Sequence, residues 1–132
     1  MPYLVGAGLA LCVSLFATVV GFDRDRAFYA TVTIVVGSYY SLFAAMAGST
    51  SALGIETGVA LLFVLAAAIG FKRGQWLVAA ALCGHGVLDL FHARLISNPG
   101  VPAWWPAFCM AYDVMAGGYL AILLRIRPPA SR

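Results

Sequence analysis

Three residues in the second half of the chain, His85, Asp89 and His92, have side chains that can do chemistry and a spacing that groups them. In an α-helix, which turns by about 100° per residue, positions 0, +4 and +7 fall within roughly 60° of one another. The two imidazoles and the carboxylate would therefore share one helix face. Such groups bind divalent transition metals and also transfer protons. Their order differs from the His-Glu-x-x-His zinc motif, so the spacing predicts a polar site without selecting its chemistry.

Two further carboxyl groups, Glu56 and Asp113, interrupt other apolar stretches of the sequence. A charge at the centre of a bilayer costs at least about 2.5–3.5 kcal/mol, so such residues usually face a protein interior. At 1.5 Å per residue, all these groups lie about 6–16 Å from one side of the membrane. We therefore expect one shared site, with His85, Asp89, His92, Glu56 and Asp113 as metal ligands and Asp89, Asp113 and Glu56 as catalytic groups.

Other side chains at a similar depth could complete this site. Ser38, Tyr39 and Tyr40 could supply hydroxyl groups. Cys109 precedes Asp113 by four residues, so both can face inward, and it is either a soft metal ligand or a packing residue. Arg94 lies on the opposite face of its helix, from which we expect it to reach a lipid headgroup.

Three interpretations of the polar residues stay open. In the first, they bind a divalent transition metal, such as Zn or non-haem Fe, as a cofactor. In the second, they form an acid–base cluster, in which Asp89 orients an imidazole and Asp113 or Glu56 is the general base. In the third, they are a structural polar core, with His85 bonded to Asp89, and His92 to Glu56 or Asp113.

The elements that must position these residues are membrane spans. Of the 132 residues, 63% are hydrophobic and only 10% are charged, whereas soluble proteins average about 45–50% and about 25%. A soluble fold of this size could not bury so much apolar surface. We predict an all-α integral membrane bundle of about five antiparallel helices. It forms a single transmembrane domain over residues 1–132, with spans at about 3–22, 27–47, 52–71, 75–96 and 104–124.

The basic residues predict the orientation of this bundle. Seven lie on one side, in two loops and the C-terminal tail: Arg24, Arg26, Lys72, Arg73, Arg125, Arg127 and Arg132. The positive-inside rule then places the N-terminus outside, the C-terminus in the cytoplasm and the polar site in the outer half of the bilayer. The first run has no preceding basic residue and no clear cleavage site, so we interpret it as a retained span. The expected location is the inner (plasma) membrane.

Composition also limits the partners. The charges lie at the ends of apolar runs and form no stripe, which argues against binding to nucleic acid. The expected partners are membrane lipids, and a homo-oligomer is a further option. The three cysteines are an odd number within or near apolar spans, so a disulfide framework is not expected.

Small residues flank the polar positions. Gly54 and Gly58 surround Glu56, Gly84 and Gly86 surround His85, and Gly117 and Gly118 follow Asp113. In lipid, such residues let helix backbones approach closely, either to build a site or simply to pack. The segment 98–106 contains three prolines and is predicted to be rigid. It is either a lid over the site or a tight turn.

The arrangement His85-x3-Asp89-x2-His92, followed by Asn98-Pro99 and Cys109-x3-Asp113, resembles a family of small uncharacterised bacterial multi-pass membrane proteins. Glu56 stands on the preceding span, as in that family. Ala93 follows His92 where the family has a second histidine. The resemblance covers roughly residues 54–113. It implies a bacterial membrane protein with one shared polar site and implies no particular reaction.

These observations lead to three functional hypotheses. The first is a membrane-embedded enzyme that acts on a lipid or another apolar substrate at the outer leaflet, either metal-dependent or by acid–base chemistry. The second is a proton- or metal-ion-coupled transporter or channel subunit. The third is a structural membrane subunit. The cytoplasmic half has few polar residues, mainly Ser14, Thr31 and Thr33, which disfavours a conducting path.

Overall fold

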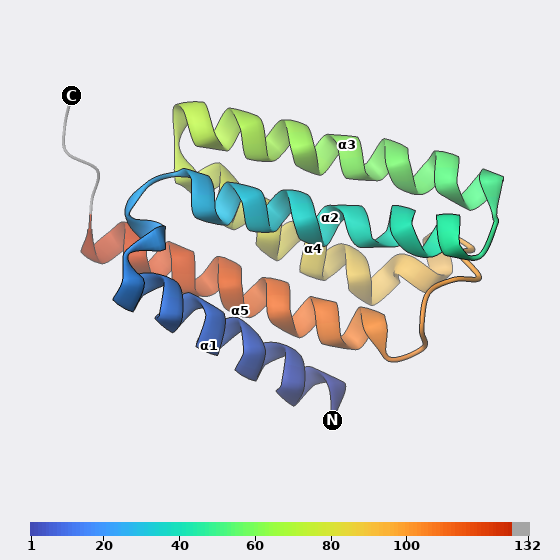
Figure 1. Ribbon diagram of the computed structural model, residues 1–132, viewed down its shortest axis with the longest axis horizontal. Coiled ribbons are helices and arrows are strands. Elements are labelled where there is room, and N and C mark those ends of the chain that lie inside the picture. Colours follow the sequence, from blue (N-terminus) through green and yellow to red (C-terminus); the bar gives the residue numbers. More distant parts are fainter. Residues whose placement is uncertain (128–132) are drawn as a thin grey trace.

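The computed structural model describes residues 1–127, and all the regular structure in that part is helical (Figure 1). All five long helices are long and apolar enough to cross a membrane. This confirms the all-α class and the number of candidate spans, and each of the five long helices begins and ends within two residues of its predicted span. A short 3-10 helix, η1, spans Phe22–Arg24. The long helices are α1 (Pro2–Val20), α2 (Ala27–Met46), α3 (Thr50–Arg73), α4 (Gln75–Leu95) and α5 (Trp105–Ile126).

The helix ends follow local sequence signals. Gly21 ends α1 in the left-handed conformation, with φ of 93°, which residues with a Cβ rarely adopt. Ser49 caps α3, because its hydroxyl accepts a hydrogen bond of 3.3 Å from the backbone N–H of Ala52. Pro106 stands in the first turn of α5, where the missing N–H would have no helical partner.

Helix α4 lies at the centre of the bundle. It packs most extensively on α5 and also contacts α3 and α2. Helices α1 and α3 lie at opposite edges, α1 against α5 and α3 against α2 (Figure 1). Because α4 faces three neighbours, polar residues along its inner face can meet side chains from three other helices.

Two glycines allow the close contact between α4 and α5. A Cβ on Gly117 would lie 2.6 Å from Cys83 Sγ and 3.0 Å from the carbonyl oxygen of Ala79, and one on Gly86 would lie 3.0 Å from that of Met110. The close helix contacts predicted at the other four glycines do not occur between the described helices of this chain. A Cβ on Gly54, Gly58, Gly84 or Gly118 would meet nothing within 4 Å.

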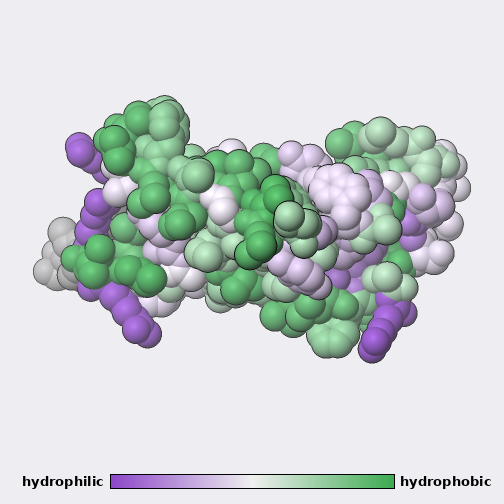
Figure 2. Space-filling model, turned by 90° about the horizontal axis from the view of Figure 1, so that it is seen from below, coloured by the Kyte–Doolittle hydropathy of each residue, from purple (hydrophilic) through white to green (hydrophobic). Residues whose placement is uncertain are grey.

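The outer surface of the bundle is apolar between polar ends. Figure 2 shows hydrophilic side chains near the two ends of the long axis and mainly hydrophobic side chains between them. Large apolar residues are exposed on every long helix, among them Phe16, Leu42, Leu62, Leu90 and Ile122. A soluble monomer rarely exposes so continuous an apolar surface, whereas a bilayer solvates it.

Hydrogen bonds connect the segments that carry the basic residues at one end of the bundle. We call this end the basic end. The Arg26 guanidinium donates to the carbonyl oxygen of Lys72 at 3.1 Å, at the C-terminus of α3 where a positive charge is favourable. The Gln75 amide donates to the carbonyl oxygen of Asp25 at 3.3 Å, and Arg127 Nη1 lies 3.5 Å from Asp23 Oδ1. The predicted basic residue Arg132 lies outside the described residues.

Candidate metal centre

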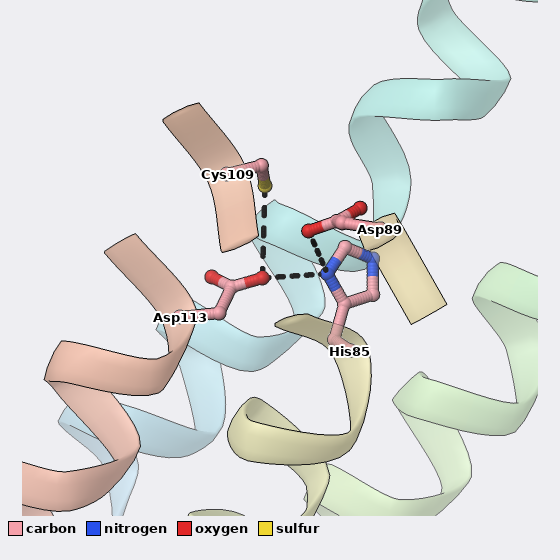
Figure 3. Close-up of side chains that lie close together, drawn as sticks. All are labelled: His85, Asp89, Cys109 and Asp113. Carbon is pink, nitrogen blue, oxygen red and sulfur yellow. Dashed lines mark hydrogen bonds and ion pairs between the residues drawn. The ribbon is translucent and has the colours of Figure 1, made fainter. Parts of the chain in front are cut away.

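His85 is the hub of a buried polar cluster on α4 and α5 (Figure 3). Its Nδ1 lies 2.6 Å from Asp113 Oδ2 on α5 and 3.6 Å from Asp89 Oδ2, one turn along α4. All three side chains are at most 2% exposed. The second distance is too long for a hydrogen bond, so the imidazole pairs with Asp113 across the helix interface.

Cys109 adds a sulfur atom to this cluster. Its thiol donates to Asp113 Oδ2 at 3.6 Å from one turn earlier on α5, and the residue is 2% exposed. One ligand atom each from His85, Asp89, Cys109 and Asp113 can be chosen so that all lie within 4.8 Å of one another. We call these four residues the centre.

The four ligand atoms would have to rearrange to hold one ion. Zn²⁺ binds nitrogen, oxygen and sulfur at about 2.0–2.3 Å, so ligands in a tetrahedron lie roughly 3.4 Å apart. His85 Nδ1 and Asp113 Oδ2, which lie 2.6 Å apart, would separate to reach that distance, and ligand atoms that lie up to 4.8 Å apart would approach each other. The mixture of imidazole, carboxylate and thiolate suits a borderline-soft metal such as zinc and does not suit Mg²⁺ or Ca²⁺.

Two carboxylate oxygens in the centre are buried without a partner. Asp89 Oδ2 and Asp113 Oδ1 accept no hydrogen bond from any of the residues 1–127. Unpaired buried polar atoms are rare because their desolvation is not compensated. Where both carboxyl groups are ionised, one imidazole does not balance their charge. Both features fit a cation held between Asp89 and Asp113.

Aromatic rings surround the imidazole of His85. The Tyr40 hydroxyl, from α2, donates a hydrogen bond of 2.5 Å to Asp89 Oδ1, which confirms the expectation that Tyr40 supplies a hydroxyl group. Phe63 of α3 meets the His85 ring edge-on, with ring centroids 4.7 Å apart. Apolar rings exclude water and lower the local dielectric, which strengthens electrostatic interactions inside the site.

Glu56 and His92 form a second polar group beside the centre. His92 Nε2 lies 2.7 Å from Glu56 Oε1, and both residues are 2% exposed. The Asn98 amide donates to Glu56 Oε1 at 2.9 Å and to the carbonyl oxygen of Tyr40 at 3.0 Å. The His92 ring stacks on Tyr40, with centroids 3.8 Å apart and planes 10° apart. We call Glu56, His92 and Asn98 the relay group.

The five polar residues that the sequence assigned to one site thus meet in two adjoining groups. His85, Asp89 and Asp113 lie in the centre, and Glu56 and His92 lie in the relay group. Of the pairings considered from the sequence, His92 with Glu56 is present. Tyr40 contacts both groups.

Comparisons with protein-family models, curated proteins and solved structures find no match. The family resemblance therefore stays a prediction, and the function has to be inferred from the geometry of the centre and its surroundings.

Sequence reasoning missed one residue of the relay group. Asn98 was predicted only as part of a rigid turn, yet its amide bridges that turn to Glu56. The segment that follows also packs on α2, because a Cβ on Gly100 would lie only 1.9 Å from the carbonyl oxygen of Phe43. A signal was present in the sequence: Asn98 is the one amide side chain in a segment with three prolines.

Proposed function

We propose that this chain is a membrane-embedded metalloenzyme whose centre holds one divalent transition metal, best matched by Zn²⁺. The ligands would be His85 Nδ1, one carboxylate oxygen each from Asp89 and Asp113, and the Cys109 thiolate. The observation that carries this proposal is the convergence of four buried donor atoms within 4.8 Å. The unpartnered oxygens of both aspartates support it.

We further propose that consecutive spans run antiparallel across the plasma membrane, with the basic end in the cytoplasm and the N-terminus outside. The gathering of Arg26, Lys72 and Arg127 at one end supports this orientation through the positive-inside rule. The centre would then lie in the outer half of the bilayer, where it could reach a membrane-dissolved substrate.

An enzyme fits the bundle interior better than a transporter does. Most buried side chains between the centre and the basic end are apolar, and Leu82, one turn from His85, is fully buried. The buried polar groups there are Ser14, Thr33 and the Tyr29 hydroxyl. In the same region Thr33 is buried, but its hydroxyl is already bonded to the carbonyl oxygen of Tyr29 at 2.9 Å. A transported ion would need polar groups across the whole membrane depth. Other buried apolar residues of this region are Ala67, Val78, Ala79, Leu120 and Leu123.

A metal bound there would supply Lewis acidity, and it would activate a water only as a fifth ligand or in place of one of the four side chains, since catalytic zinc sites keep an open position. The protein residues have separate tasks. Tyr40 fixes Asp89 through its hydroxyl, and the Phe63 ring shields His85 from water. Glu56 and His92 form a hydrogen-bonded acid–base pair next to the centre. Asn98, in the loop at the other end of the bundle from the basic end, donates a hydrogen bond to Glu56. The Glu56–His92 pair is suited to exchange protons with the surface at that end.

Metal analysis of the purified protein tests the proposal. The full chain, extracted in mild detergent, should carry a stoichiometric transition metal, which His85→Ala and Cys109→Ser should lose. Cys12→Ser is the matched control, because Cys12 is an exposed cysteine on α1 outside the centre. Co²⁺ loaded into the wild type should give a thiolate-to-metal absorption band that is absent from Cys109→Ser. A wild-type protein that neither contains metal nor binds added Zn²⁺ or Co²⁺ would overturn the proposal.

A further inference from the structure

An apolar groove runs along the bundle beside the centre. It lies between α2 on one side and α1, η1 and α5 on the other, and its volume is about 690 Å³. The groove exists because the backbones of α2 and α5 approach each other only slightly, and the backbone of α1 lies close to α5 but not to α2. Its lining includes Thr31, Val35, Tyr39, Trp105 and Cys109.

The dimensions of the groove select a narrow occupant. Along α2 it extends from Ala27 to Tyr39, which is about 18 Å at 1.5 Å per residue. Dividing the volume by this length gives a mean cross-section of about 40 Å² for the centres of water-sized atoms, which corresponds to a physical width of about 10 Å. An α-helix with side chains is about 10–12 Å wide, so a helix from a second copy would have to push α2 and α5 apart to enter fully. An extended hydrocarbon chain is thin enough.

The lining of the groove also favours hydrocarbon. Most of the side chains are aliphatic or aromatic, and the helices that carry them are long and apolar enough to cross a membrane. In the hydrocarbon core of a bilayer there is no bulk water to fill such a space, and acyl chains are the solvent.

One end of the groove reaches the centre. Cys109 lines the groove and also bonds to Asp113. Trp105 lines the same end, where its ring contacts Tyr39 with centroids 4.9 Å apart. The indole Nε1 of Trp105 is buried and has no hydrogen-bond partner in the described part of the chain. It is therefore a buried donor without a partner among those residues, one turn from Cys109 on α5. At the other end, Asp25 and Phe22 mark the basic end.

We propose that the groove binds one hydrocarbon chain of a membrane lipid, with the tail toward the basic end and an oxygen-bearing polar group near Trp105 and Cys109. The substrate of the centre is then a lipid whose reacting bond lies next to its first methylenes. That this lipid is the substrate rests on the proposed function, whereas the binding of its hydrocarbon tail in the groove does not.

Photocrosslinking tests the binding directly. The full chain is reconstituted in vesicles of phosphatidylethanolamine and phosphatidylglycerol that contain phospholipid with a diazirine either at the tail end or near the ester. The tail-end probe should label peptides around Thr31, and the ester-proximal probe should label peptides around Tyr39 and Trp105. Val35→Trp, which fills the groove from an exposed position, should reduce both labels severalfold, and Thr31→Trp should do the same. Val64→Trp, at a similarly exposed valine on α3, should not.

Metal content separates the two proposals. Val35→Trp should keep its metal and lose the groove label, and Cys109→Ser should lose its metal and keep the label. Labelling spread evenly over all the exposed helices and unaffected by Val35→Trp would overturn the groove proposal and leave the metal centre standing. Crosslinks between two copies through the groove would overturn it equally.

Discussion

Tyr40 and Asp89 are joined by a hydrogen bond of 2.5 Å that links α2 to the central helix α4 inside the bundle. The ring of the same tyrosine stacks on His92. Tyr40 therefore holds one ligand of the centre with its hydroxyl and one member of the relay group with its ring. Groups that orient a metal ligand in this way commonly change metal affinity by tenfold or more when they are removed.

Tyr40→Phe separates these two roles, because it deletes the hydroxyl and keeps the ring. We expect metal affinity to fall by about 10-fold or more as Asp89 loses its orienting partner. The free energy of unfolding should fall by about 1–2 kcal/mol. Chelator competition measures the first effect and thermal unfolding in detergent the second. Tyr39→Phe is the control, since Tyr39 contacts the groove and not Asp89. Equal metal affinities in both variants would contradict this role.

Glu56→Gln tests the separation of the two polar groups. The substitution leaves His92 without its carboxylate partner, so we expect activity and stability to fall, the latter by about 1–3 kcal/mol. Metal content should stay at the wild-type level, because Glu56 lies outside the four residues of the centre. Loss of metal from Glu56→Gln would indicate that Glu56 is a metal ligand, as predicted from the sequence, and would contradict its place outside the centre.

Gly117→Ala tests the helix contact that builds the centre. The added methyl group would lie 2.6 Å from Cys83 Sγ and 3.0 Å from a backbone oxygen of α4, so α4 and α5 must separate. We expect a loss of about 1–3 kcal/mol in stability, together with weaker metal binding as His85 moves away from Asp113. Gly118→Ala, where a Cβ meets nothing within 4 Å, is the matched control. If both variants bind metal like the wild type, the close contact is not required.

The proposed orientation can be tested by labelling in whole cells. Ser97 and Lys72 are both exposed; Ser97 follows the C-terminus of α4, and Lys72 lies in the last turn of α3, just before the N-terminus of α4. A membrane-impermeant maleimide should react with Ser97→Cys in intact cells, and with Lys72→Cys only after permeabilisation. The reverse pattern would place the basic end outside.

Much of the fold could be predicted because each span needs only a long apolar run, and lipid tolerates few alternatives to a helix. The shared face of His85, Asp89 and His92 also followed from helix periodicity, and all three are buried. Their division into two groups did not. His85 and His92 are two turns apart, about 10 Å along the helix axis, which exceeds the separation of two ligands on one metal.

The partners of each histidine depend on how the helices rotate against one another, and spacing within one helix carries no information about this. Gly117 and Gly86 bring α5 close enough for Asp113 and Cys109 to meet His85. From the sequence, several glycines were equally good candidates for a close helix contact, and only the packing of the helices distinguishes those that contact a neighbouring helix. Asn98 was missed for a similar reason, since its partners Glu56 and Tyr40 are far from it in sequence.

X-ray absorption spectroscopy of the metal-loaded protein identifies the ligand atoms of the centre themselves. For Zn²⁺ the account predicts one sulfur at about 2.3 Å, with nitrogen and oxygen ligands at about 2.0–2.2 Å and a single imidazole. The sulfur signal should vanish in Cys109→Ser and persist in Cys12→Ser. A spectrum with two imidazoles and no sulfur, unchanged by Cys109→Ser, would contradict the assignment of the centre to His85, Asp89, Cys109 and Asp113.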